Sequence, residues 1–128
     1  MTKLSERIEA CTGDTTELAA EMLTFVTGEE CERRTVSVHM NGNRRYSLFM
    51  AGHQVANPLT NLNAIAALER EYLPGQYWPV YIETYRSGIA YISSIKLADG
   101  QPTFLKAPTE ALARSAALVR ALEVSRDV

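Results

Sequence analysis

The chain has 128 residues, 13 basic and 15 acidic, and a net charge of −2, which is typical of one ordinary globular domain spanning residues 1–128. A dedicated nucleic-acid binder would show a strong basic excess, and a membrane-spanning protein would need an apolar run of about 20 residues. Residues 1–10 are charged and lack a signal-peptide core. We therefore expect a cytoplasmic protein, in which Cys11 and Cys31 are unpaired thiols.

Two helices are predicted at the start of the chain. Leu4 and Ile8 are four residues apart, as expected for a short amphipathic helix. Asp14 and Glu17 have the spacing of a capping box, and they predict the start of a second helix. Gly28 stands where that helix should end.

A first hairpin is predicted at residues 35–51, after a charged connection at residues 29–34. Its apolar side chains occupy even positions: Val36, Val38, Met40, Tyr46, Leu48 and Met50. Only a loop of odd length pairs even positions with even positions. This pattern predicts a three-residue loop at residues 41–43, with Met40 facing Arg44.

A loop at residues 52–58 and a third helix at residues 60–72 lead to a central hairpin at about residues 77–97. Aromatic and β-branched side chains crowd both arms of this hairpin, on either side of a turn at Gly88. Pro79 cannot donate a ladder hydrogen bond, which favours an edge position or a bulge for the first arm.

A short strand and a final helix are predicted near the C-terminus. We expect the strand at residues 103–106 and the helix at about residues 108–123, since Pro108 suits a first helical turn. The central hairpin is apolar on both faces and therefore needs cover on both sides. The expected fold class is α/β (α+β), a three-layer α/β/α sandwich with a largely antiparallel sheet of about 4–5 strands.

Parts of the chain resemble a known family. Residues 58–68 look like a Tyr-Thr-x-Ser-hydrophobic-Asp-Ala-Ala helix start, with Asn61 and Asn63 in place of Ser and Asp at what look like helix-cap positions. Residues 107–121 are similar to an alanine-rich closing helix that begins Thr-Pro-Ala-x-Ala-Leu, with Ala107 in place of Thr. These features resemble the phage α-β-α sandwich (ABA) domain family, small phage and prophage proteins of unknown function. The resemblance implies a viral protein in the host bacterial cytosol, and it transfers no catalytic residue.

Metal and nucleophile motifs are weak in this sequence. Cys31, His39 and His53 lie outside any CxxC, HxH or HExxH arrangement, so we expect neither a metal nor a cofactor. A Cys31–His39 nucleophile pair would require a depressed thiol pKa, which Arg33 or a neighbouring arginine could supply. Glu83 is the other candidate catalytic residue. It lies in the apolar central hairpin, where burying an unpaired carboxylate costs free energy.

The first hairpin is the expected interaction surface. Its candidate residues are Arg33, Arg34, His39, Arg44, Arg45 and Phe49. In the expected pairing, Arg34 lies about 20 Å from the arginines of the second strand, so the four arginines need not form one patch.

Three functions follow from these residues. The first is a non-enzymatic protein that binds a phage or host protein, with the hairpin as a contact element and as a dimer edge. The second is a small nucleic-acid-associated protein that uses the four arginines. The third, the least favoured, is a small enzyme that uses Cys31 or Glu83.

Overall fold

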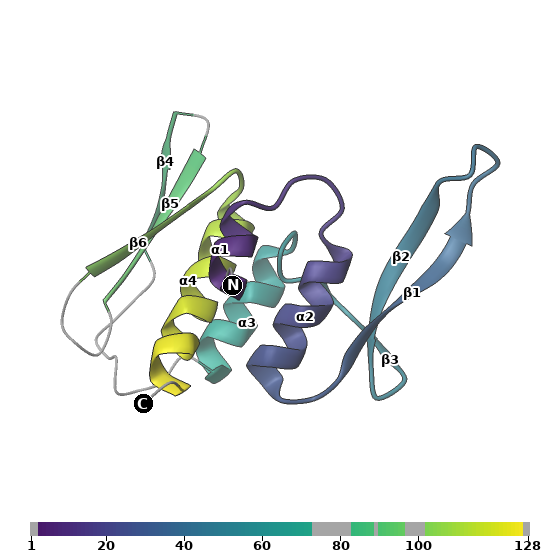
Figure 1. Cartoon of the computed structure of the whole chain (residues 1–128), viewed down its shortest axis with the longest axis horizontal. Helices are drawn as coiled ribbons and strands as arrows, with labels where there is room; N and C mark the ends of the chain where they lie inside the picture. Colours follow the sequence, from purple (N-terminus) through teal and green to yellow (C-terminus); the bar gives the residue numbers. More distant parts are fainter. Residues whose placement is uncertain (1–2, 73–82, 89, 97–101, 127–128) are drawn as a thin grey trace.

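The computed structural model describes residues 3–72, 83–88, 90–96 and 102–126, which form four helices and six strands (Figure 1). The elements are α1 (Leu4–Glu9), α2 (Thr16–Thr27), β1 (Cys31–Val38), β2 (Arg44–Met50), β3 (His53–Val55), α3 (Leu62–Tyr72), β4 (Glu83–Ser87), β5 (Ala90–Lys96), β6 (Pro102–Ala107) and α4 (Glu110–Arg126).

The described strands form two antiparallel three-stranded sheets, ordered β1-β2-β3 and β4-β5-β6. The helices lie between the two sheets (Figure 1). Helix α4 contacts all three strands of the second sheet, and α2 contacts β1 and β2. The class is therefore mixed α and β, as expected. The strands do not form the single expected sheet of four or five strands, and the α/β/α layering is not confirmed.

The predicted helix α2 is confirmed, but its N-cap is Thr15, which forms no side-chain cap hydrogen bond, so the capping box predicted at Asp14 and Glu17 is not found among the described contacts. A carboxylate oxygen of Asp14 accepts hydrogen bonds from the backbone N–H of Thr16, at 3.0 Å, and from its hydroxyl, at 2.8 Å. Gly28 ends the helix in the left-handed conformation, with φ of 78°. The side chains that α2 buries are Ala19, Met22, Leu23 and Val26.

Helix α4 forms the centre of the core. It contacts α1, α2 and α3 as well as the second sheet, so nearly every side of it is covered. Its small buried side chains allow this close approach. The alanines with no exposed surface are Ala113, Ala116, Ala117 and Ala121.

Capping residues start the last two helices. The Asn61 side chain accepts a hydrogen bond from the backbone N–H of Ala64 at 3.0 Å, and the Thr109 hydroxyl accepts one from Leu112 at 3.2 Å. Asn61 is therefore a helix-cap residue, as its place in the sequence pattern suggested. Helix α4 continues to Arg126, three residues beyond the expected end.

Three boundaries in the first half differ from the sequence predictions. The expected charged connection is partly strand, because β1 already begins at Cys31. A short strand, β3, lies in the segment predicted as a loop. Helix α1 ends at Glu9, whereas the predicted first helix continues to residue 12.

The second sheet confirms a hairpin between β4 and β5, in which Ser87 pairs with Ala90. The predicted strand near residues 103–106 is β6. Pro79 and the rest of the first predicted arm up to residue 82 lie outside the described residues. Within the described ranges, no helix has both the length and the apolar character needed to cross a membrane.

Candidate functional site

The base of the β1–β2 hairpin is anchored to the helices by one face, which we call the inner face. Cys31 pairs with Met50 and Arg33 pairs with Leu48, and these side chains share the face toward α2. Cys31 and Leu48 are buried, with 7% and 2% of their surface exposed. The opposite face, which we call the outer face, carries Phe49 and is turned away from α2.

A β-bulge changes the register between the base and the tip of this hairpin. Thr35 pairs with Tyr46 but Ser37 pairs with Arg45, so Val36 is an extra residue on β1. Arg44 consequently faces Val38, and the predicted pairing of Arg44 with Met40 is wrong. The turn is closed one residue earlier than expected, where the His39 N–H donates to the Asn43 carbonyl at 2.7 Å.

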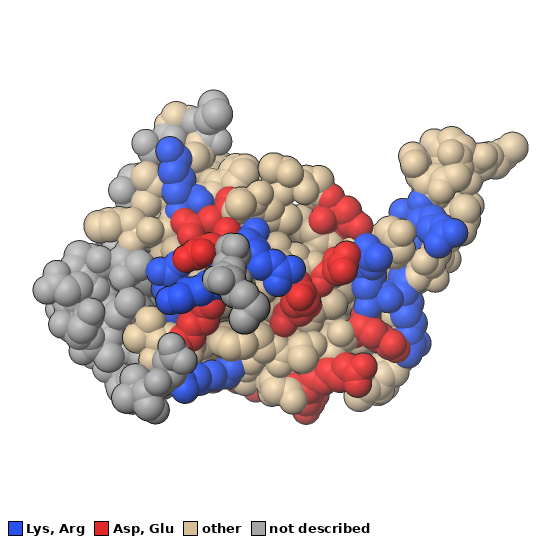
Figure 2. Space-filling model, viewed as in Figure 1, with Lys and Arg blue, Asp and Glu red and all other residues tan. Residues whose placement is uncertain are grey.

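The tip of the hairpin exposes large apolar side chains. Val36 is 48% exposed, Val38 is 62% exposed, and Met40 is fully exposed. Figure 2 shows the tip projecting from the body of the molecule. Three such side chains on one projecting element are unusual for a surface that only meets water.

Arg33 is engaged within the protein on the inner face. Its guanidinium lies 4.0 Å from the centre of the Tyr46 ring, and it forms an ion pair with Asp14 at 3.3 Å. The backbone hydrogen bond from Thr16 and the charge of Arg33 hold the Asp14 pKa below its ordinary value. Arg33 therefore links β1 to the start of α2.

Arg34 is engaged in the same way on the outer face. It pairs with Glu32, with one hydrogen bond of 2.6 Å, and its guanidinium lies 4.8 Å from the centre of the Phe49 ring. Both arginines at the base thus have an acidic and an aromatic partner.

Arg44 and Arg45 are exposed, and neither has an ion-pair partner among the residues that the structure describes. They are adjacent on β2, so their side chains leave on opposite faces of the sheet. Arg34 faces Ser47, two residues from Arg45, which is about 7 Å along the strand. The expected separation of about 20 Å was too long, and the four arginines form two rows, one on each face.

An acidic pocket of about 530 Å³ lies at the base of the hairpin on the outer face. Its lining residues are Glu29, Glu30, Glu32, Phe49, Ala51 and Gly52. Neither Glu29 nor Glu30 forms an ion pair with any part of the chain that is described. The sequence prediction missed this pocket, although the run of three glutamates beside the hairpin was a visible signal.

The geometry does not support catalysis by Cys31. Burial, and then the charge of Glu32, raises the pKa of its thiol. His39 is exposed at the far end of β1, roughly 25 Å away by the usual rise per residue. A Cys31–His39 pair is therefore wrong, and so is a metal site that combines these residues with His53. Among the described residues, no group of three potential ligands could hold a metal ion.

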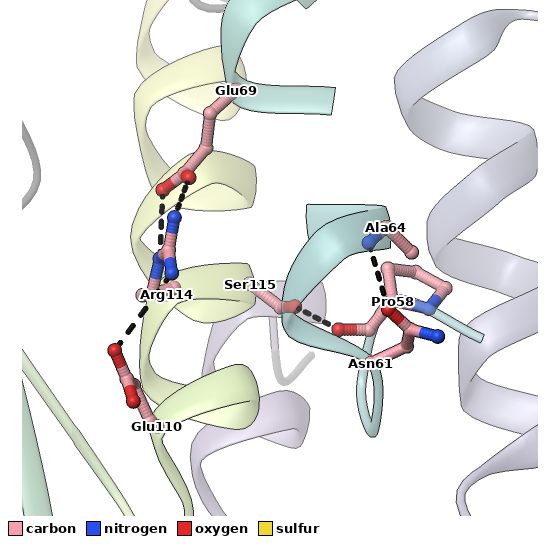
Figure 3. A network of polar contacts seen from close by, with 7 residues as sticks. All are labelled: Pro58, Asn61, Ala64, Glu69, Glu110, Arg114 and Ser115. Atoms are coloured by element: carbon pink, nitrogen blue, oxygen red, sulfur yellow. Dashed lines mark hydrogen bonds and ion pairs between the residues drawn. The ribbon is translucent and has the colours of Figure 1, made fainter. Parts of the chain in front are cut away.

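A second groove, of about 670 Å³, lies where the starts of α3 and α4 meet the α1–α2 loop. Cys11 and Tyr91 line it, and burial followed by the charge of Asp14 raises the pKa of the Cys11 thiol. Figure 3 shows the polar contacts near this groove, in which Arg114 lies between Glu69 and Glu110.

The contacts in Figure 3 stabilise the junction between α3 and α4. The buried Ser115 hydroxyl donates to the Pro58 carbonyl at 3.2 Å. The pairs of Arg114 with Glu69 and Glu110 are also internal to the fold, so this polar network has a structural role. The side chain of Glu83, the other catalytic candidate, lies outside the described set, and only its backbone pairing with Ser94 is given.

Comparisons with protein-family models, with curated proteins and with solved structures each return no match to this chain.

Proposed function

We propose that this protein works by binding another protein, without catalysis, through the tip of the β1–β2 hairpin. The observation that carries the proposal is the exposure of Val38 and Met40 on an element that projects from the core. Burying such side chains against a partner would contribute about 25 cal/mol per Å² of apolar surface. The unpaired Arg44 and Arg45 would then select an acidic partner surface.

The setting we propose is a phage or prophage protein in the host bacterial cytosol, with an assembly role or a role against a host protein. This part rests on the sequence resemblance to the α-β-α sandwich family. The anchoring of the hairpin base supports the binding proposal, because a contact element must be held by a rigid body.

Nucleic-acid binding is the second candidate, and the charges favour it less. Arg33 and Arg34 are already paired with Asp14 and Glu32, which leaves two free arginines at the hairpin. A protein that contacts many phosphates needs more cations than this. Fluorescence anisotropy with labelled DNA and RNA at low salt tests the alternative, which requires binding that is lost in Arg44→Ala/Arg45→Ala.

Site-specific photo-crosslinking tests the main proposal. A benzoylphenylalanine replaces Met40 in one variant, and the exposed Ala67 of α3 in the control. We expect a discrete covalent adduct from position 40 and none from position 67. Adding Val38→Asp to the first variant should reduce the adduct several-fold. Equal adducts from both positions, or none from position 40, would contradict the proposal.

A further inference from the structure

We infer that the partner of the hairpin tip is a second copy of this chain, docked in the opposite direction. This inference rests on the proposed function and names its partner. The basic tip, defined as Met40 and Arg45, would contact the acidic pocket of the other copy.

Charge is the first reason. The tip carries Arg45, which has no acidic partner in the described structure, and the pocket carries Glu29 and Glu30, which have no basic partner there. Figure 2 shows basic residues along the hairpin and acidic residues spread over the body, where they are mixed with other basic ones. The base of the hairpin therefore has carboxylates without a basic partner, and the tip has a basic group without an acidic partner.

Geometry is the second reason. Arg45 and Phe49 are both on the outer face, since they are four residues apart on β2. Glu32 pairs with Phe49, and Arg45 is four residues before Phe49, so acidic and basic groups are about 13 Å apart along β2. When two outer faces pack about a twofold axis, with their strands antiparallel, each tip lies over the other copy's pocket. Such an interface is isologous, and each charge contact occurs twice.

The chemistry of the pocket is the third reason. Its wall includes the Phe49 ring, which the Arg34 guanidinium already contacts, and the carboxylates of Glu29 and Glu30 offer hydrogen-bond acceptors to Arg45. The flexible thioether of Met40 also suits an aromatic surface. Arg34 lies near the middle of this face, and its charge is already paired with Glu32.

The contact we infer is face to face rather than an extension of the sheet. The free edge of β1 carries charged residues and the bulge at Val36, two features that discourage pairing with another strand. On the outer face, the charges without a partner in the described structure have opposite sign at the two ends, and Arg34 between them is paired with Glu32.

Sedimentation of the full chain tests the dimer. At low salt the wild-type mass should rise with concentration toward twice the 14.2 kDa of one chain, and it should fall again at high salt. Arg45→Glu should weaken the dimer at least tenfold, and so should Glu29→Lys/Glu30→Lys, because each change places like charges at both contacts.

A mixture of the two variants gives the decisive result. The reversed tip of one chain meets the reversed pocket of the other, so mixing two monomeric variants should restore a dimer. The matched control is Arg70→Glu, which makes the same change in net charge as Arg45→Glu at an exposed residue away from the hairpin and should remain dimeric. A monomeric wild type at every concentration, or a mixture that stays monomeric, would overturn the inference.

The two experiments separate the inference from the proposed function. A photo-adduct of two chains from position 40 agrees with the dimer. An adduct with a different protein, together with a monomeric wild type, would overturn the dimer while leaving the binding function of the tip in place. Absence of any adduct from position 40 would contradict the proposed function itself.

Discussion

The arginines of the β1–β2 hairpin differ in what surrounds them. Arg33 and Arg34 each have a carboxylate and an aromatic ring as neighbours, so their charges are engaged inside the molecule. Arg44 and Arg45 lie beyond the bulge and have no such partners in the described structure. Position along one hairpin therefore separates structural arginines from arginines that are available to a partner.

A half-buried ion pair gives a prediction at the same scale. In the pair of Arg114 with Glu69, the side chains are only 20% and 13% exposed. Glu69→Gln should lower the free energy of unfolding by about 1–2 kcal/mol, because the guanidinium keeps only the more distant Glu110 as a charged partner. Urea unfolding measures the change.

The control for Glu69→Gln is Glu21→Gln, at a pair with Arg7 in which both side chains are 46% exposed. Water already solvates those charges, so this change should cost about 0.5 kcal/mol or less. Equal losses in the two variants would show that burial does not strengthen the Arg114 pair.

The cysteines give a second prediction. Burial raises the pKa of both thiols, so little thiolate forms at neutral pH. A disulfide reagent should modify both residues more slowly than a free thiol at pH 7.5, with Cys31 slower than the half-buried Cys11. The rates should rise with pH to above 8.5. Rapid modification of Cys31 at neutral pH would revive the enzyme hypothesis, and Cys11→Ser assigns the two rates.

At the scale of elements, the bulge at Val36 separates the hairpin into two parts. Below it, odd positions of β1 face the core, as the buried Cys31 and Leu48 show. Above it, Val38 joins the face of Arg44 but lies beyond the helices. The sequence shows a row of even apolar positions, and it does not show that β1 gains an extra residue.

The end of α2 gives an element-scale prediction. Gly28 has φ of 78°, and a Cβ added there would meet nothing within 4 Å. Gly28→Ala should therefore cost about 1 kcal/mol from backbone conformation alone, measured as a lower urea midpoint. Gly28→Asn is the matched variant, and it should cost less because asparagine tolerates this conformation. Identical effects of Ala and Asn would argue against the conformational explanation.

At the scale of the whole molecule, the helices form a core between two small sheets. Because α4 contacts the other three helices and the second sheet, the rest of the fold is arranged around it. The first sheet is attached through its inner face at the base, and this leaves the tip free to meet a partner.

The packing of α4 gives the last prediction. Ala117 has no exposed surface, so Ala117→Leu must displace its neighbours and should lower the free energy of unfolding by about 1–3 kcal/mol. The control is Ala67→Leu on the exposed side of α3, expected within about 0.5 kcal/mol of wild type. Calorimetry or urea unfolding measures both. A neutral Ala117→Leu would mean that α4 is packed less closely than described.

The sequence by itself determined the type and approximate place of most elements. Helical spacing of apolar residues and the stop at Gly28 predicted α2 correctly, because helices are specified by contacts between residues close in the chain. Asn61 was recognised as a cap for the same reason. The first hairpin was placed correctly in the chain, and its role as an interaction surface stays a prediction.

Only the tertiary structure decided how the strands assemble, which arginines are paired and where the acidic pocket lies. The division into two sheets depends on which strands meet across the core, and local periodicity carries no information about such distant pairing. Asp14, which precedes α2, forms an ion pair with Arg33 of β1. Glu29 and Phe49 line the same pocket only after β2 has paired with β1. These features arise from long-range contacts, so they appear only after the chain is folded.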